Sequence, residues 1–444
     1  MANAKPQIIS KTLIKPSSPT PKDLKTYKLS SLDQLSPHFY LPIVLFFQAL
    51  DSEKHSGNIN NDISSHFKKS LSETLTHYYP FAGRLSSKHH SIDCDDQGLD
   101  FYEARIDCKL NDILKKPDPE TMDLFSPPGI LFNESFQGSP FIIQVTNFSC
   151  GGIALSTCML HKVTDACALF GFLNDWAATA RGEKVSPMFL TQQVISSFSD
   201  QMTNFQEIKL EKNNVVTRRF SFDPSKLTEL KAIITKDSGT LQINPSRVEV
   251  VTALIYKCAM VASKAKTGVS RPSMLIQAAN LRPRVFPPLP ENSIGNFSWF
   301  FSIMTNDENG KSVTKIVDAL KKSAKGFSEK FGNELSANKC YSLICESIEG
   351  TRKVIRENKS EIEVYRCSSL CRYPFNQMNF GWGKPIWVGT SSSKMKNTFH
   401  LLDSLKPEGG IEALVTLEED KMAIFEKDEE ILRFALLNPT AVDD

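Results

Sequence analysis

The sequence predicts an α/β fold built from two similar halves. Its 444 residues, 41% of them hydrophobic and 23% charged, are enough for one large domain or two ordinary domains with separate cores. Gly151-Gly152-Ile153 opens a predicted strand that leads to a helix, and Gly409-Gly410-Ile411 does the same near the C-terminus. Only the first copy has a histidine where its strand ends, so we expect histidine-based chemistry in at most one of the two halves.

The charge of the chain is nearly balanced. Lys and Arg total 52 and Asp and Glu total 50, which gives a formal net charge of +2 at pH 7. This balance offers no electrostatic reason to expect nucleic acid or an anionic membrane as a partner, so a neutral small molecule fits better. The apolar stretch 39–50 is interrupted by Pro42 and Gln48 and is shorter than the roughly 20 residues of a membrane span. Because the N-terminus has no apolar run of the kind a secretory signal needs, we expect a cytoplasmic protein.

The ten cysteines do not indicate a metal site. No CxxC pair occurs, and the closest pair, Cys367 and Cys371, has no histidine beside it that could complete a zinc site. We therefore expect buried free thiols and no metal.

Apolar periodicity and turn residues predict the elements of the first half in order. Ile63, Phe67, Leu71 and Leu75 recur every fourth residue and predict a helix over 62–77. The segments predicted after it are a turn at 79–84, short strands near Ile92 and Phe101, a strand pair at 141–148 and 153–160, and a helix over 164–180 that ends before Gly182. His161 is therefore expected between a strand and a helix.

A polar stretch with little pattern separates the two halves. We interpret residues 186–216 as a crossover linker between an N-terminal domain, 1–185, and a C-terminal domain, 217–444. Ser246, followed three residues later by a glutamate, forms a capping box ahead of an apolar helix over 247–264. The remaining predicted elements are strands at 274–281, 386–390, 399–403 and 411–417 and a closing helix over 418–436.

The segment His161-Lys-Val-Thr-Asp165 is the candidate reactive element. It could also be an ordinary structural turn, with a hydrogen-bonded imidazole and a carboxylate at the start of a helix. A two-ligand metal site is a further alternative, but no second His or Glu lies nearby in the HExxH manner. The sequence has no GxSxG, GxGxxG or P-loop motif, which argues against a serine hydrolase, a nicotinamide dehydrogenase and a P-loop enzyme. A histidine base without a protein nucleophile suits direct transfer between two substrates.

The segment 379–385, NFGWGKP, places two glycines and a proline around Trp382 in a region that otherwise predicts strand. The glycines indicate backbone that bends or is closely approached, and Pro385 excludes a central position in a sheet. On composition alone, the segment is a bulged loop with a packed indole.

Together, HKVTD in the middle of the chain and NFGWG near the C-terminus resemble the HxxxD and DFGWG signatures of the BAHD family of plant acyl-CoA-dependent acyltransferases. The resemblance covers essentially the whole chain. Further segments that look like family landmarks lie at 14–21, 79–84, 280–282, 295–296 and 410–412. The opening segment and the run 387–425 look most like the alkaloid-acetylating branch.

The resemblance implies two chloramphenicol-acetyltransferase-like domains of mixed sheet flanked by helices, with the active-site channel between them. His161 would be the general base, which takes the proton from an acceptor hydroxyl and returns it to the CoA thiolate. Trp382 would donate its indole N–H to the oxyanion of the tetrahedral intermediate. Asp165 would pair with Arg282 and hold the turn that orients His161.

The resemblance also implies which residues bind the donor and which shape the second motif. The expected CoA contacts are Ser246, Arg247 and Asn280, although the capping box by itself explains Ser246. The expected structural loop consists of Asn379, Phe380, Gly381 and Gly383. Two positions depart from the family: Asn379 stands where the signature has aspartate, and Leu370 stands where relatives often have tryptophan.

The expected activity is transfer of an acyl group, acetyl above all, from acyl-CoA as co-substrate to a hydroxyl of a plant alkaloid or terpenoid. We expect a monomer that works through a ternary complex. Acylation of an amine and a malonyl or aromatic acyl donor are alternatives. So is a non-catalytic family member that binds a ligand, for which Asn379 and Leu370 are the hints. The intact His161 and Asp165 favour catalysis.

Overall fold

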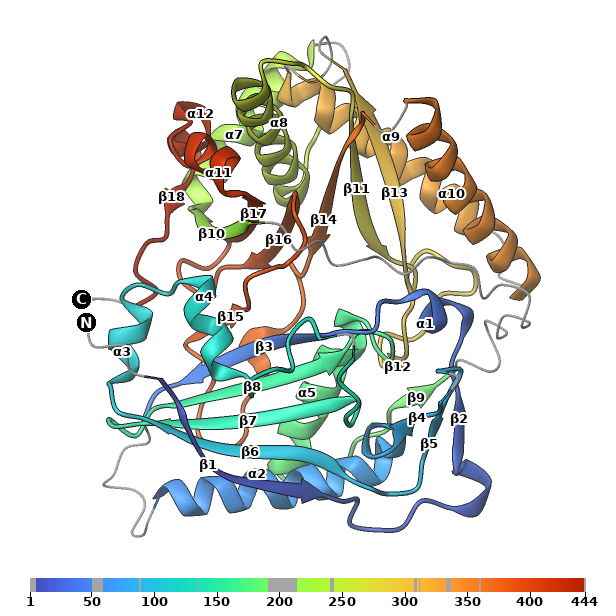
Figure 1. The fold of residues 1–444 in the computed structure, drawn as a ribbon, viewed down its shortest axis with the longest axis vertical. Helices are drawn as coiled ribbons and strands as arrows, with labels where there is room; N and C mark the ends of the chain where they lie inside the picture. The colour runs from blue at the N-terminus through green and yellow to red at the C-terminus, as the bar shows by residue number, and fades with distance from the viewer. Residues whose placement is uncertain are drawn as a thin grey trace.

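The computed structural model describes residues 5–49, 59–87, 89–133, 135–190, 214–239, 243–306, 310, 312–332, 337–358 and 361–442. Two sheets form the centre of the molecule, one in the lower and one in the upper half of Figure 1. Both sheets contain parallel and antiparallel pairs, so the predicted architecture of mixed sheets flanked by helices is confirmed. Most of the predicted crossover linker, residues 191–213, lies outside the described residues.

The first sheet has six strands. In spatial order they are β1 (Gln7–Ile14), β6 (Leu99–Ile106), β7 (Phe141–Phe148), β8 (Ile153–Leu160), β3 (Tyr40–Phe47) and β15 (Trp387–Thr390). Helices α2 (Ile59–His77) and α5 (Ala166–Ala180) pack against each other, and α2 runs along the bottom of the sheet in Figure 1. Phe67 and Trp176 meet in this layer, with ring centroids 5.4 Å apart, and both side chains are fully buried.

The second sheet has seven strands and a larger set of helices. In spatial order the strands are β13 (Ser298–Thr305), β11 (Ser273–Asn280), β14 (Glu363–Ser369), β16 (Thr398–Asp403), β17 (Ile411–Glu418), β10 (Val215–Phe222) and β18 (Leu436–Leu437). The helices are α7 (Pro224–Asp237), α8 (Arg247–Thr267), α9 (Val313–Phe331), α10 (Ala337–Glu357), α11 (Glu419–Phe425) and α12 (Glu429–Phe434). Helices α8 and α9 lie at the top of Figure 1, on the side of the second sheet that faces away from the first.

Smaller elements close the edges of the first half. They are a three-stranded sheet of β2 (Thr26–Lys28), β5 (Ser91–Asp93) and β4 (Arg84–Leu85), a pair formed by β9 (Met188–Phe189) and β12 (Ser293–Ile294), and the short helices α1 (Ser31–Leu35), α3 (Leu110–Leu114) and α4 (Pro119–Met122). The β9–β12 pair joins the start of the predicted crossover linker to the predicted C-terminal domain.

Most predicted elements are confirmed, but the closing helix over 418–436 is wrong. The chain forms two short helices there, α11 and α12, because Asp428 restarts the helix. The Asp428 carboxylate accepts the backbone N–H groups of Glu430 and Ile431, at 2.9 and 3.1 Å, and so caps α12. The sequence analysis also missed several elements, above all β3, whose continuous apolar run is typical of a strand buried on both faces.

Strand β15 connects the C-terminal part of the chain to the first sheet. It pairs antiparallel with β3, with Trp387 opposite Phe46, although it lies within 217–444 in sequence. The core of the first half contains further side chains from the same region, namely Phe375, Met378, Phe380 and Val388. The loop that carries NFGWG and the residues that follow β15 are therefore held against the first half.

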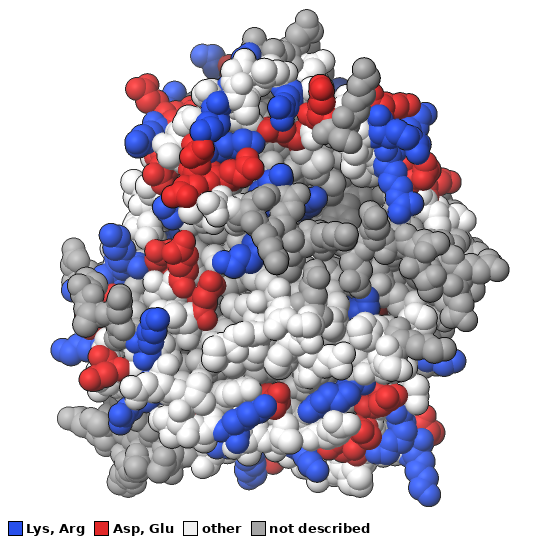
Figure 2. Space-filling model, in the orientation of Figure 1, with Lys and Arg blue, Asp and Glu red and all other residues white. Residues whose placement is uncertain are grey.

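The molecular surface agrees with the balanced charge of the chain. On the face drawn in Figure 2, Lys and Arg are interspersed with Asp and Glu along the upper and lower parts, and the middle is mostly uncharged. Among the described residues, no helix is long and apolar enough to cross a membrane.

Candidate active site

His161 lies directly after β8, at the point where the first sheet faces the second. Strand β8 is buried along its whole length, so its C-terminal end is fixed in the core. The backbone N–H of His161 donates to the carbonyl of Phe39 at 3.0 Å, and its carbonyl accepts the side-chain amide of Asn296 at 3.0 Å. These two bonds hold the backbone of His161 from both sides of the interface.

The imidazole of His161 is available for chemistry. Its Nδ1 is buried and has no hydrogen-bond partner among the described residues. Burial lowers the pKa of His161 below its ordinary value of 6.5, and the nearby charge of Asp165 opposes this shift only in part. The imidazole is therefore neutral at pH 7, which is the form that can accept a proton.

Asp165 does not hydrogen-bond to His161. Its carboxylate forms a two-point ion pair with Arg282, with distances of 2.8 Å to Nη1 and 3.1 Å to Nη2. It also accepts the backbone N–H of Ala168 at 3.0 Å, as the N-cap of α5, and that of Phe297 at 2.9 Å. Arg282 is fully buried and donates to the carbonyls of Ser293 and Gly295 as well. Asp165 thus ties the His161 turn to the second half of the molecule.

A second carboxylate, which the sequence analysis missed, supports the same turn. Asp33 is fully buried in α1 and accepts the backbone and side-chain N–H groups of Asn296, at 2.7 and 2.9 Å. Asn296 in turn holds the carbonyl of His161. Burial raises the pKa of Asp33 to about 6, although the hydrogen bonds from Asn296 and Ser30 oppose this shift. No local pattern in the sequence relates Asp33 to a residue 128 positions away.

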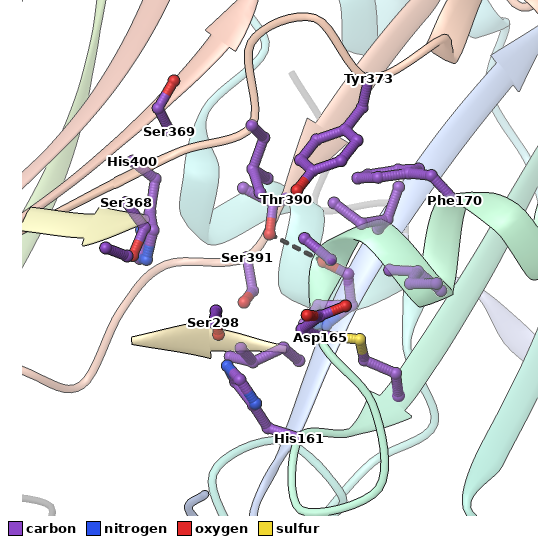
Figure 3. Close-up of a pocket in the computed structure, with 18 of the residues that line it drawn as sticks. His161, Asp165, Phe170, Ser298, Ser368, Ser369, Tyr373, Thr390, Ser391 and His400 are labelled. Carbon is purple, nitrogen blue, oxygen red and sulfur yellow. Dashed lines mark hydrogen bonds between the residues drawn. The ribbon is translucent and has the colours of Figure 1, made fainter. Parts of the chain in front are cut away.

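The imidazole faces a cavity of about 150 Å³. Figure 3 shows His161 on one side and residues of the second sheet and of the β15 end on the other. The apolar part of the lining consists of Leu41, Pro42, Ile43, Phe132, Met159, Leu169, Phe170 and Leu370. Hydroxyl groups in the lining come from Ser298, Ser368, Ser369, Tyr373, Thr390, Ser391, Ser392 and Ser393. A cavity of this volume can hold a group about the size of benzene.

A second imidazole lines the same cavity. His400 lies on β16, a strand of the second sheet, and faces the cavity from the side opposite His161 (Figure 3). Burial lowers the pKa of His400 to about 4, and electrostatic repulsion from His161 adds to this effect. The sequence analysis missed His400, because a lone histidine in a strand carries no sign of which face it occupies.

A larger channel of about 840 Å³ adjoins this cavity. The two share the lining residues Phe170, Ala278, Ala279, Asn280, Ser369 and Tyr373. Of the predicted CoA contacts, Ser246 and Asn280 line the channel, and Arg181, Arg284 and Arg372 line it too. Arg247 is not among its lining residues, because its guanidinium pairs with Asp403 at 2.9 Å and donates to the carbonyls of Gly409 and Gly410.

Trp382 lies away from His161, which is a correction to the role expected for it. Its ring packs against α2, with centroids 4.9 Å from Phe67 and 5.5 Å from His66, and it is not among the described residues that line the cavity. The indole N–H therefore cannot reach an oxyanion beside His161. Position 370 does line the cavity, but a leucine offers no donor there.

The rest of the NFGWG loop forms a closed structural unit. The side-chain oxygen of Asn379 accepts the backbone N–H groups of Gly381 and Gly383, both at 2.9 Å. Both glycines have positive φ angles, 115° and 123°, which other residues rarely adopt. Phe380 is fully buried and packs edge-on against Trp176, with centroids 5.0 Å apart. The loop anchors β15 to the first half of the molecule.

Comparison with known proteins assigns the chain to a family. Residues 4–432 match the model of the Transferase family. The chain belongs to the BAHD acyltransferase family. It is 40% identical over 441 residues to 17,18-epoxy-17-hydroxycur-19-ene N-malonyltransferase from Strychnos nux-vomica, over 98% of this chain and 92% of that protein. It is 42% identical over 437 residues to akuammiline synthase 1 from Alstonia scholaris, over 97% of this chain and 98% of that protein.

Among solved structures, the crystal structure of vinorine synthase superimposes on this BAHD chain with a TM-score of 0.84. The two are 32% identical, and the match covers 99% of this chain and 100% of that one. The resemblance drawn from HKVTD and NFGWG is therefore confirmed, as are the two chloramphenicol-acetyltransferase-like domains. The protein is an acyltransferase.

Proposed function

We propose that this BAHD acyltransferase transfers acetyl from acetyl-CoA to a hydroxyl group of an alkaloid or terpenoid, with His161 as the general base. The observation that carries the proposal is the position of the His161 imidazole, which lines a small cavity that adjoins a larger channel. Burial lowers the pKa of His161, which favours the neutral form that a general base needs. This arrangement supports a reaction in which two substrates meet beside one base.

The proposed reaction is a direct transfer. His161 accepts the proton of the acceptor hydroxyl while the hydroxyl oxygen forms a bond to the thioester carbon, and the carbonyl oxygen gains the negative charge. When this intermediate collapses, the carbon–sulfur bond breaks and the imidazolium returns its proton to the CoA thiolate. Asp165 takes no proton in these steps. It positions His161 through the ion pair with Arg282 and the cap of α5.

The large channel is the proposed site of the CoA part of the donor. Its volume of about 840 Å³ falls within the range of ligand pockets. Arg284 and Arg372 supply positive charge for phosphate groups, and Ser246 and Asn280 supply polar contacts, whereas Arg181 is paired with Glu183 at 2.8 Å. We omit Arg247 from this group because its guanidinium is already paired with Asp403.

The cavity supports a small and neutral acyl group. Its described lining includes one carboxylate, Asp165, which is paired with Arg282, and two imidazoles, His161 and His400, which burial keeps neutral. A malonyl group would bring a carboxylate into this cavity without a cation to pair with, and an unpaired buried charge is strongly unfavourable. The name of akuammiline synthase 1 supports an alkaloid as acceptor.

A donor and acceptor panel tests the proposal. Purified protein is incubated with acetyl-CoA, malonyl-CoA or an aromatic acyl-CoA and with a set of alkaloid and terpenoid alcohols and amines, and products are identified by mass spectrometry. We expect O-acetyl products and a kcat/KM for acetyl-CoA about 10²-fold above that for malonyl-CoA. Equal or better use of malonyl-CoA would overturn the donor, and N-acyl products would overturn the acceptor. No product with any donor would favour a ligand-binding family member.

A further inference from the structure

Three consecutive serines follow β15, and their hydroxyl groups have different surroundings. All three are buried, with exposed fractions of 5%, 5% and 3% for Ser391, Ser392 and Ser393. The Ser392 hydroxyl donates to the Asp123 carboxylate at 2.7 Å, and the Ser393 hydroxyl accepts the N–H of Met395 at 3.1 Å. Among the described residues, no group forms a hydrogen bond with the hydroxyl of Ser391, which lines the His161 cavity.

The backbone around Ser391 is fixed on both sides. Before it, β15 pairs with β3, and the hydroxyl of Thr390 donates to the carbonyl of Pro42 at 2.7 Å. After it, the backbone N–H of Ser392 donates to Asp123 at 3.0 Å. Figure 3 shows the Ser391 hydroxyl directed from the end of β15 into the cavity, on the side where His161 lies. A donor held in this way needs little reorganisation during a reaction.

The proposed reaction needs such a donor. The intermediate places a negative charge on the former carbonyl oxygen of the thioester, and a charge in a water-poor cavity requires hydrogen bonds. Trp382 lies outside the cavity, and Leu370 offers no donor inside it. Among the described lining residues, the side chains that can donate a hydrogen bond include the amide of Asn280 and several hydroxyl groups, that of Ser391 among them.

We propose that Ser391 is a further catalytic residue, whose hydroxyl donates a hydrogen bond to the oxyanion formed at the thioester carbonyl. The inference rests on the proposed acyl transfer. Ser391 transfers no proton: its O–H stays intact while the carbonyl π electrons move to oxygen, and the bond weakens again when the carbon–sulfur bond breaks. Ser298 also lies near His161 in Figure 3, but it begins the edge strand β13 and is more exposed.

The test compares neighbouring serines. Ser391→Ala should lower kcat by about 10²-fold, leave both KM values within about twofold and leave the melting temperature unchanged. Ser391→Thr, which keeps a hydroxyl, should recover most of the turnover. Ser392→Ala is the neighbouring comparison: Ser392 also lines the cavity, but its hydroxyl is already engaged by Asp123, so this variant should lower the melting temperature and reduce kcat far less than Ser391→Ala does. Wild-type kcat in Ser391→Ala, or a comparable loss in Ser298→Ala instead, would overturn the assignment.

A second measurement tests the role of Ser391 and does not require the acceptor to be known. Slow hydrolysis of acetyl-CoA, followed by release of the CoA thiol, passes through an oxyanion at the same carbonyl. Ser391→Ala should lower this rate by a similar factor even if no acceptor in the panel is acylated. If hydrolysis and transfer are both unaffected by the substitution while His161→Ala abolishes them, Ser391 is not the donor and the proposed function stands. If the wild-type protein shows neither activity, both proposals fall.

Discussion

Two strand-to-helix connections in the molecule have similar local sequences but different surroundings. Strand β8 and strand β17 each follow a Gly-Gly pair and begin with isoleucine, each has eight residues, and each leads into a helix, α5 or α11. The first turn carries His161 with an unpartnered Nδ1. The second carries Lys421, whose ammonium contacts Glu363 at 2.8 Å and Glu418 at 3.1 Å.

The difference lies in what faces each turn. The β8 turn faces a cavity between the two sheets. The ion pair of Asp165 and Arg282 lies at this turn and does not include the imidazole of His161. At the β17 turn, Lys421 and Glu363 are mostly buried and satisfy each other, and Glu363 also accepts a hydrogen bond from Ser263. The repeated design supplies a rigid turn, and the neighbouring sheet decides whether a reactive group is left open.

The largest expected effect is at the first turn. His161→Ala should lower kcat by about 10²-fold to 10⁴-fold, because the substitution removes the proposed general base. The melting temperature should change little, since the imidazole Nδ1 makes no hydrogen bond. Product formation and thermal unfolding are measured on the same sample. A folded variant with near-wild-type turnover would show that His161 is not the base.

Asp165→Asn should lower the stability of the protein more than it lowers the turnover of the folded enzyme. The substitution leaves the guanidinium of Arg282, which is fully buried, without its counter-charge. Breaking one side of a buried pair lowers the free energy of unfolding by about 3 to 5 kcal/mol. Denaturant unfolding measures this loss, and turnover is normalised to the folded fraction. Equal stability with a large loss of turnover would instead make Asp165 a direct catalytic partner.

Acidification should affect the two turns in different pH ranges. At the cavity, the pKa values of His161 and His400 are lower in the folded protein than the ordinary 6.5. The unfolded chain therefore binds more protons below pH 6.5, and this part of the stability falls from that pH downwards. At β17, burial would raise the pKa of Glu363, but hydrogen bonds, that of Lys421 first, lower it below 4.5. Its contribution is present above pH 4.5 and is lost only as the pH falls through that lowered value.

The substitution His400→Gln tests whether the histidines cause the loss of stability in the higher of the two pH ranges. The substitution removes one of the two imidazoles and leaves Glu363 untouched, so the drop in melting temperature between pH 7 and pH 5 should become smaller. The kcat/KM of wild type should fall only below pH 6.5, because neutral His161 is the active form. An unchanged pH dependence of the melting temperature in His400→Gln would show that His400 does not stay neutral in the folded protein.

Lys421→Met should weaken the second turn without affecting catalysis. It leaves Glu363 mostly buried with Ser263 and Tyr365 as its remaining donors. We expect a loss of about 1 to 3 kcal/mol in the free energy of unfolding, smaller than for Asp165→Asn because Glu363 keeps two hydrogen bonds. The kcat should equal that of wild type. A comparable loss of turnover in this variant would contradict the assignment of chemistry to the first turn alone.

The smallest expected effect is that of Asn379→Asp in the NFGWG loop. The guanidinium of Arg181 donates to the backbone carbonyl of Asn379, so a cation lies close to this position. A carboxylate would still accept the N–H groups of Gly381 and Gly383, and charge-assisted bonds are stronger. The site is half-buried, so the gain is at most about 1 kcal/mol. A clear drop in melting temperature would show that the loop is built around the amide.

Local sequence patterns were sufficient to predict the elements that depend on residues close together in the chain. The helix with Phe67 and Leu71, the strand pair on either side of Gly151 and the capping box at Ser246 all occur as predicted, because each depends on residues within about four positions. The two motifs were sufficient to identify the family, and the role of His161 in HKVTD stays a prediction.

Only the tertiary structure decided which other residues share the site. Asp33, Ser391 and His400 come to the His161 turn from α1, from the end of β15 and from β16. Trp382 stands in a family motif, yet it packs on α2, because β15 holds its loop against the first sheet. The physical reason is range: helix periodicity, capping and turns act between near neighbours. The cavity, by contrast, arises where two sheets meet and bring together side chains more than 100 positions apart.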